Sequence, residues 1–377
     1  MATPLAGKAT PEHTQNLAKK HQALGYRKLG TTQLSVSNLG YGTYRVEEEN
    51  SDHVQSLKQA LQSGINLIET ATSYTAGSSE RLVGRTIRKL IQSKDLNRDE
   101  LVIISKAGYL QEQSLQRMKA RCSRGMGVPE IVEFSDKFWH CIHPEFLETE
   151  ITNSISRLGV ATIDVYLLHN PEYFLLNAKR VGGGTRPALL ATFYQRVEQA
   201  FAHLEKEVQA GRIQYYGISS NTITDSDALM PTLDLEKLLE IANQVGGADH
   251  HFQVIQCPLN LLEPQAALSK RESGKTVLEI AQEANLGVLT NRPLNAILGG
   301  GLIRLSAPLE VAPPVMPAQN LLRLSSFEKH LREILNVEIS KRGETIEVAY
   351  FFRWTEEFNE MKEKFKNMVE WEDFLFG

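Results

Sequence analysis

The chain has 377 residues, of which 42% are hydrophobic and 23% are charged, and its formal net charge is -4 at pH 7. A chain of this length buries either one barrel-sized core or two ordinary ones. Its apolar runs are too short to span a membrane, and its basic residues are scattered rather than gathered into one stripe. The composition therefore argues against a membrane-spanning protein and against a nucleic-acid-binding one.

The three cysteines, Cys122, Cys141 and Cys257, form no CxxC pair and are too few for a disulfide framework, which favours a reducing compartment. Residues 1–24 lack the apolar core of a secretory signal and are expected to form a flexible arm. A cytoplasmic protein is expected, and the low acidity of this arm leaves organelle import open. The stretch HCIH (140–143) has no second pair at a zinc spacing, so no metal site is predicted.

From about residue 38 to residue 290, short apolar runs alternate with amphipathic segments, as in consecutive βα units. The runs predict seven strands at 38–44, 65–69, 101–106, 163–169, 213–219, 252–256 and 286–291. Apolar residues at helical spacing predict helices around 54–61, 82–91, 147–158 and 197–208. The strands do not alternate strictly between apolar and polar residues, as expected of a parallel sheet covered on both faces.

Three other segments interrupt or precede this pattern. Residues 26–36 predict a small hairpin that turns at Gly30 to Thr32 and closes one end of a barrel. The connections 107–142 and 170–187 are longer than minimal loops, and they are either walls of an active site or inert surface insertions.

Polar or ionisable residues stand at the end of each predicted strand. They are Thr43 with Tyr44, Glu69, Lys106, His169, Ser219, Gln256 and Asn291. Because parallel βα barrels collect their functional groups at the carboxyl ends of the strands, these side chains are expected to meet at one mouth.

Four of these residues suggest acid–base chemistry. The ammonium of Lys106 would stabilise the phenolate of Tyr74 and lower the pKa of Tyr74, while Glu69 would hold Lys106 protonated. A neutral imidazole at His169 would donate a hydrogen bond to a carbonyl oxygen. The group would then give a proton to a developing alkoxide, although Lys106 and Glu69 also fit a purely structural ion pair.

A developing alkoxide implies hydride delivery, which no side chain performs, so a nicotinamide cofactor is the natural complement. Its carboxamide would hydrogen-bond to Ser219, Asn221 and Gln256.

Eight blocks of the sequence, in order, resemble the aldo-keto reductase superfamily between residue 27 and about residue 298. They are RKLGTTQLSVSNLGYGTYRV, GINLIETATSY, SERLVGRTIRKL, LVIISKAG, LGVATIDVYLLHNPE, GRIQYYGISSN, VIQCPLNLLE and LGVLTNRPLNA. The resemblance implies a (β/α)8 TIM-type barrel that binds NADPH, less often NADH, without a Rossmann domain or a metal. NADP(H) is therefore expected ahead of NAD(H), with a small carbonyl compound or alcohol as substrate.

The family's catalytic Asp, Tyr, Lys and His match Glu69, Tyr74, Lys106 and His169. Its carboxamide-binding serine and asparagine match Ser219 and either Ser220 or Asn221, and its glutamine matches Gln256. The resemblance also implies cofactor contacts for the strand-end residues Thr43, Tyr44 and Glu69 and for the string Asn291, Arg292, Pro293 and Leu294.

The sequence departs from the family pattern in three places. Glu69 replaces the aspartate, and Asn291 stands where a stacking aromatic residue is usual, with the cation Arg292 beside it. The eighth strand is missing, because the helix expected at 341–354 is followed only by a charged helical pattern.

These features predict an N-terminal arm at 1–24, a barrel at 25–317 and a C-terminal helical segment at 318–377. The expected activity is NAD(P)H-dependent interconversion of a carbonyl and an alcohol with Tyr74 as the proton donor. The alternative is a nucleotide-binding regulatory relative, or one whose catalysis is impaired.

Overall fold

The structure is a computed structural model that describes residues 3–225, 233–298, 301–306 and 325–333. The chain divides into two compact units, Met1–Leu305 and Ser306–Gly377. In the second unit, residues 325–333 are helical. The predicted boundary at 317, the helix predicted at 341–354 and the segment searched for an eighth strand lie outside the described residues.

Seven parallel strands form the centre of the first unit, and each strand pairs with its neighbour in chain order. They are β3 (Tyr41–Gly42), β4 (Leu67–Glu69), β5 (Val102–Ala107), β9 (Ile163–His169), β10 (Ile213–Ser219), β11 (Phe252–Pro258) and β12 (Gly287–Asn291). All seven predicted strands are confirmed. Consecutive parallel pairing is the topology of a (β/α)8 barrel, so the predicted fold class is confirmed, with seven of its strands among the described residues.

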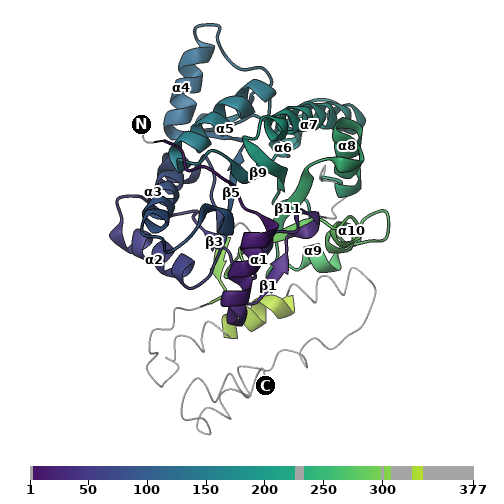
Figure 1. The fold of residues 1–377 in the computed structure, drawn as a ribbon. Helices are drawn as coiled ribbons and strands as arrows, with labels where there is room; N and C mark the ends of the chain where they lie inside the picture. Colours follow the sequence, from purple (N-terminus) through teal and green to yellow (C-terminus); the bar gives the residue numbers. More distant parts are fainter. Residues whose placement is uncertain (1–2, 226–232, 299–300, 307–324, 334–377) are drawn as a thin grey trace. The chain divides into compact units, whose positions relative to one another are not determined.

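Helices follow the strands and lie around them in Figure 1. They are α2 (Ser51–Gln62), α3 (Ser78–Gln92), α5 (Pro144–Leu158), α6 (Tyr173–Val181), α7 (Arg186–Gln209), α8 (Leu235–Gly246), α9 (Gln265–Leu268) and α10 (Val277–Glu283). The four predicted helices correspond to α2, α3, α5 and α7. Local signals fix their starts: for example, the Asn50 side chain accepts hydrogen bonds from the backbone N–H groups of Asp52 and His53 at the start of α2.

The strands bury both of their faces. Ile68, Ile103 and Tyr166 belong to the core that the strands share with the surrounding helices. Their neighbours in sequence, such as Leu67, Val102 and Val165, belong to a second core. Alternate residues of a strand point to opposite faces, so each strand contributes to two apolar layers, and the lack of strict alternation in the sequence is explained.

The N-terminal hairpin completes the second core. Strands β1 (Tyr26–Lys28) and β2 (Ser35–Ser37) pair antiparallel around the 3-10 turn η2 (Gly30–Thr32), as predicted. Leu29, Leu34 and Val36 pack in the second core with the strand residues. A Cβ atom at Gly30 would lie 2.4 Å from the backbone nitrogen of Gly287, so only glycine lets the turn approach β12 this closely.

The segment before residue 25 is not the flexible arm that its polar composition predicts. It contains α1 (Pro11–Lys20), whose Leu17 is buried, and the short 3-10 helix η1 (Gln22–Leu24). Ala9 is also buried, and its backbone N–H donates to Asp164 Oδ1 at 2.7 Å. The prediction failed because a few buried residues and several buried hydrogen bonds anchor a segment whose average composition is polar.

The connection at 107–142 folds into a small antiparallel sheet with one helix. It comprises β6 (Tyr109–Gln111), α4 (Glu112–Cys122), β7 (Val132–Ser135) and β8 (Phe138–His140). The remaining elements are η3 (Tyr74–Gly77), η4 (Arg98–Glu100), η5 (Gly247–Asp249) and the pair β13 (Asn295–Leu298) and β14 (Gly301–Arg304).

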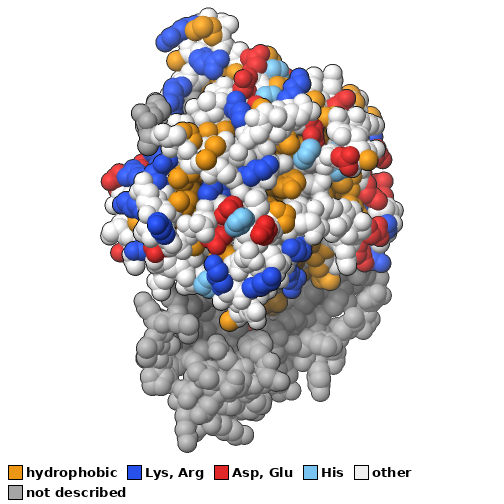
Figure 2. All heavy atoms as spheres, viewed as in Figure 1, with side chains coloured by type: hydrophobic (Ala, Val, Ile, Leu, Met, Phe, Trp, Pro, Cys, Tyr) orange, Lys and Arg blue, Asp and Glu red, His pale blue; other side chains and the backbone are white. Residues whose placement is uncertain are grey.

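On the face drawn in Figure 2, acidic and basic side chains are interspersed, and no single sign of charge dominates. Among the described helices, none combines the length and the hydropathy that a membrane span requires.

Candidate active site

The carboxyl ends of the central strands bring the predicted residues together. Ser219 at the end of β10 pairs in register with His169 on β9 and with Gln256 on β11. Glu69 ends β4, and Lys106 lies near the end of the adjacent β5. The parallel register therefore produces the convergence that the sequence predicts.

Lys106 is the centre of this group and is only 1% exposed. Its Nζ forms an ion pair with Glu69 Oε1, donates to the Tyr74 hydroxyl at 2.8 Å and donates to Gln256 Oε1 at 3.2 Å. Burial lowers the pKa of Lys106. The carboxylate of Glu69 acts in the opposite direction, because an adjacent negative charge stabilises the ammonium.

Tyr74 lies in the 3-10 turn η3, where the next two residues, Thr75 and Ala76, have positive φ angles of 45° and 51°. Its hydroxyl accepts the hydrogen bond from Lys106 and donates to Glu69 Oε1 at 3.2 Å. Burial raises the pKa of Tyr74, and the neighbouring Tyr109 and Tyr44 add to this shift. The predicted lowering of this pKa is therefore wrong for the chain without a bound cofactor, because desolvation of the phenolate outweighs the nearby ammonium.

His169 is held as a neutral imidazole. Burial, followed by the charge of Lys106, lowers the pKa of His169 well below its usual range. Its ring lies edge-on to Tyr74, with centroids 6.0 Å apart, and to Tyr109, with centroids 4.4 Å apart. Its Nδ1 is buried without a hydrogen-bond partner among the described residues. His140 also contacts this residue, because His140 Nε2 lies within hydrogen-bond distance, 2.8 Å, of the backbone oxygen of His169.

The predicted carboxamide-binding residues are joined to this group through Gln256. Gln256 Oε1 accepts hydrogen bonds from Ser219 Oγ at 2.7 Å and from Lys106 Nζ at 3.2 Å. Both Ser219 and Gln256 are buried. The structure also separates the two candidates that the sequence left open: Ser220 is buried and donates to Glu172, whereas the side chain of Asn221 accepts from Arg292.

Asn291 and Arg292 lie at the end of β12. Asn291 Oδ1 is buried without a hydrogen-bond partner among the described residues. Arg292, predicted to contact the cofactor, is paired within the protein: its Nη2 lies 2.5 Å from Glu263 Oε1, and its Nη1 donates to Asn221 Oδ1 at 3.1 Å. Its φ angle of 58° is in the left-handed region, which is uncommon for a residue with a side chain.

Other predicted cofactor contacts differ in their accessibility. Thr43 is fully buried, and its Oγ1 donates to the backbone oxygen of Glu69 at 3.0 Å, so it joins β3 to β4. Tyr44 is exposed, and its ring lies edge-on to that of Tyr74 with centroids 5.2 Å apart. Leu294, after Pro293 in the string, is also exposed.

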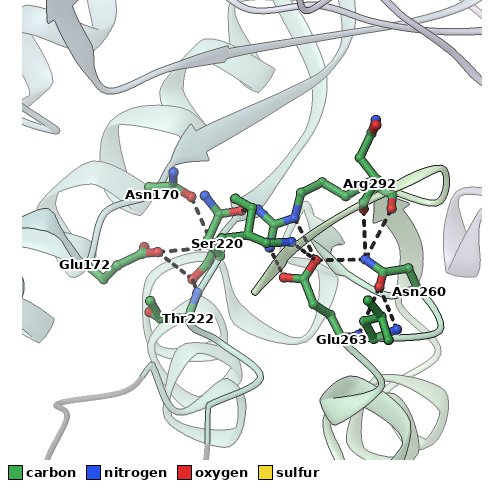
Figure 3. A network of polar contacts seen from close by, with 11 residues as sticks. Asn170, Glu172, Ser220, Thr222, Asn260, Glu263 and Arg292 are labelled. Atoms are coloured by element: carbon green, nitrogen blue, oxygen red, sulfur yellow. Dashed lines mark hydrogen bonds and ion pairs between the residues drawn. The ribbon is translucent and has the colours of Figure 1, made fainter. Parts of the chain in front are cut away.

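Figure 3 shows a polar network that the sequence did not reveal. Asn170 and Glu172, which follow β9, accept hydrogen bonds from the loop after β10. Glu263 and Asn260, which follow β11, hold the backbone and the guanidinium of Arg292. One feature of the sequence could have indicated this network. In the string HNPE, His169 ends a predicted strand and is followed by two more side chains that can form hydrogen bonds, Asn170 and Glu172.

Metal ligation has no support in the parts of the chain that the structure describes, because no three His, Cys, Asp or Glu side chains gather there in a way that could hold an ion. The group around Lys106 instead contains a proton donor, a charge that stabilises the donor's conjugate base, and buried amide and hydroxyl groups. This arrangement suits proton transfer to an oxygen beside a neutral polar ligand.

Comparisons with known proteins identify the family of the chain. The model of the Aldo/keto reductase family matches residues 38–352. The chain is 28% identical over 149 residues to the NADH-specific methylglyoxal reductase of Escherichia coli, a match that covers 37% of the chain and 40% of that protein. It is 22% identical over 272 residues to the aldo-keto reductase YhdN of Bacillus subtilis, which covers 70% of the chain and 60% of that protein.

Among solved structures, the aldo-keto reductase AKR11C1 from Bacillus halodurans is similar at 20% identity and a TM-score of 0.47, over 74% of each chain. The matches span about half the length of the curated relatives. Because the family model covers most of the sequence, the chain belongs to the aldo/keto reductase family.

Proposed function

We propose that this chain is an NAD(P)H-dependent oxidoreductase that interconverts a small carbonyl compound and its alcohol. One observation carries the proposal: Tyr74 is partly buried with its hydroxyl 2.8 Å from Lys106 Nζ, and Lys106 is in turn paired with Glu69. Family membership and the name of the E. coli relative, a methylglyoxal reductase, support a small carbonyl substrate.

In this proposal Tyr74 donates the proton to the carbonyl oxygen. Burial keeps its hydroxyl protonated at neutral pH, which a donor requires. When the proton leaves, the adjacent Lys106 ammonium stabilises the phenolate, and Glu69 keeps Lys106 charged. His169, neutral because its pKa is lowered by burial, orients the carbonyl oxygen by hydrogen bonding.

The residues beside Tyr74 fit a nicotinamide. A carboxamide needs both donors and acceptors, and Ser219, Gln256 and Asn291 offer them at adjacent strand ends; Asn291 Oδ1 has no partner among the described residues. These three residues would hold the carboxamide, and the reduced nicotinamide would supply the hydride. NADPH is the first cofactor to test, on the family resemblance, and NADH is the second because the E. coli relative is named NADH-specific.

Replacing Tyr74 tests the assignment. Tyr74→Phe removes the proton donor, so kcat for methylglyoxal or another small aldehyde should fall by about 100- to 10,000-fold, while the Kd of the cofactor changes little. Tyr41→Phe is the matched control, because the Tyr41 hydroxyl bonds to Ser56 away from this group. Unchanged turnover in Tyr74→Phe would rule out the assignment.

Single-turnover measurements separate this proposal from the nucleotide-binding alternative. The parent chain is mixed with NADPH or NADH, and the loss of cofactor fluorescence is followed after addition of a panel of aldehydes and ketones. Hydride transfer supports the proposal. Tight cofactor binding without transfer to any of the substrates would favour a regulatory or impaired relative instead.

A further inference from the structure

Glu172 lies behind the residues that would hold the carboxamide, at the start of α6. Its side chain is only 1% exposed. Its Oε1 accepts hydrogen bonds from Ser220 Oγ at 2.9 Å and from the backbone N–H of Asn221 at 3.2 Å. Asn170 Oδ1 accepts from the same N–H at 3.2 Å, so two side chains of the β9 loop hold the loop that follows β10 (Figure 3).

The Ser220 hydroxyl links Glu172 to the next residues of the loop. While its O–H donates to Glu172, its oxygen accepts from the backbone N–H groups of Thr222 at 3.2 Å and Ile223 at 3.0 Å. The carboxylate of Glu172 therefore anchors the chain from Ser220 to Ile223, directly at Ser220 and Asn221 and through the Ser220 hydroxyl at Thr222 and Ile223. This stretch directly follows Ser219, which the proposed function assigns to the cofactor, and contains Asn221, which the family resemblance matches to a carboxamide-binding residue.

We propose that Glu172 is a positioning residue whose carboxylate holds the loop after β10 in the conformation that binds the nicotinamide end of the cofactor. Tight cofactor binding then requires Glu172 to be deprotonated. The inference rests on the proposed function, because it assumes that this loop contacts a nicotinamide dinucleotide.

The hydrogen bonds explain why the charge matters. Glu172 Oε1 is the acceptor in both hydrogen bonds. Hydrogen bonds to an ionised carboxylate are about twice as strong as those between neutral groups. Oε2 is buried without a partner among the described residues, so a proton added there gains no acceptor. Protonation therefore weakens the anchor of the loop without forming a new bond.

The surroundings place this protonation in an accessible pH range. Burial raises the pKa of Glu172 to about 7, although hydrogen bonding by its own backbone N–H, by the Ser220 side chain and by the backbone of Asn221 and Thr222 acts in the opposite direction. Two tyrosines interact with it electrostatically, Tyr109 on β6 and Tyr173 on α6, and burial raises the pKa of each, so both are neutral here. The cation in this network, Arg292, donates a hydrogen bond to the side chain of Asn221 and forms an ion pair with Glu263.

The dissociation constant of NADH, measured by cofactor fluorescence between pH 8 and pH 6, tests the inference. If only the deprotonated form binds, Kd rises as the competent fraction falls, by about tenfold across this range. Glu172→Gln, which mimics the protonated form, should bind at least as weakly as the wild type at pH 6 and should show no such rise. NADH is the probe because the 2′-phosphate of NADPH itself titrates near pH ~6.

Glu150→Gln is the matched control, because burial also raises the pKa of Glu150 but its hydrogen bond is to Asn153 within α5. This variant should keep the wild-type rise in Kd. A wild-type Kd that is constant from pH 8 to pH 6, or a rise that persists in Glu172→Gln, would overturn the inference and leave the proposed function standing.

Failure of the proposed function looks different, because the wild-type chain would then bind neither NADH nor NADPH at any pH. If only NADPH binds, the ratio of the variant Kd to the wild-type Kd is compared across pH, since the titration of the phosphate cancels in this ratio. A ratio that falls from pH 8 to pH 6 supports the role of Glu172, and a constant ratio contradicts it.

Discussion

Glu69 is the residue at which this chain differs most directly from the family's catalytic pattern. Its carboxylate contacts both Lys106 and the Tyr74 hydroxyl through Oε1. Its other oxygen extends toward Gly42, where a Cβ atom would lie 3.6 Å from Oε2. The longer side chain therefore reaches past a glycine to contact both the Tyr74 hydroxyl and Lys106 Nζ.

Glu69→Asp should reduce turnover rather than improve it. Removing one methylene withdraws the carboxylate by roughly 1.5 Å, the length of a C–C bond, and a misplacement of about 1 Å at a catalytic group can cost about 100-fold in rate. We expect kcat to fall by about 10- to 100-fold in a steady-state assay. Glu69→Gln, which keeps the length but not the charge, is the comparison, and an increase in kcat for the aspartate variant would indicate a site impaired by the glutamate.

At the residue scale, the expectation that functional side chains lie at the carboxyl ends of the strands located the group around Lys106. It did not locate the residues that hold the neighbouring loops. Lys106, His169, Ser219 and Gln256 were predictable because each follows an apolar run that reads as a buried strand. Glu172 and Glu263 were not, because their roles depend on which neighbouring loop each one meets. The direction of the Tyr74 pKa was missed for a related reason, since the degree of burial cannot be read from the spacing of charges.

At the scale of elements, the hairpin β1–β2 and the inner faces of the strands form one core. Leu34 is 1% exposed and packs in this second core together with Leu29, Val102 and Val254. Side chains of the hairpin therefore pack against the strand side chains of the second core. Its contribution should be measurable as stability of the first unit.

Leu34→Ala should lower the free energy of unfolding by about 2–5 kcal/mol, because it leaves a cavity in this core. Urea unfolding followed by tryptophan fluorescence measures the change. Leu39→Ala is the matched control, since Leu39 is 64% exposed and its truncation should change the free energy by less than about 0.5 kcal/mol. Equal effects of the two substitutions would contradict the role of the hairpin.

Periodicity predicted the seven central strands and four of the eight described helices that follow them, because these elements repeat a local pattern. The connection at 107–142 was predicted only as a long loop, although it contains three strands and a helix. Strand β6 is only three residues long and begins two residues after β5 ends. Elements this short and this close contain too few residues to establish a period, so their pairing depends on tertiary contacts.

At the scale of the whole molecule, buried ionisable groups make opposing contributions to the pH dependence of folding. Burial lowers the pKa of His140 to about 4, so acidification below the unfolded value of 6.5 favours unfolding. Burial raises the pKa of Glu172 to about 7, so the folded chain binds a proton more readily than the unfolded chain between the unfolded value of 4.5 and pH 7. The two contributions therefore oppose each other across most of the same range.

Comparing Glu172→Gln with the wild type should isolate the glutamate contribution. Each shift of about 2.5 pKa units corresponds to about 3 kcal/mol, and the glutamate part of stability is lost as pH rises through 7. The free energy of unfolding of the variant, relative to wild type, should therefore increase by up to about 3 kcal/mol between pH 4.5 and pH 7.5. Urea titrations at several pH values measure this difference. A difference that does not change with pH would mean that Glu172 titrates normally in the folded chain, so that neither stability nor cofactor binding is governed by its charge near neutral pH.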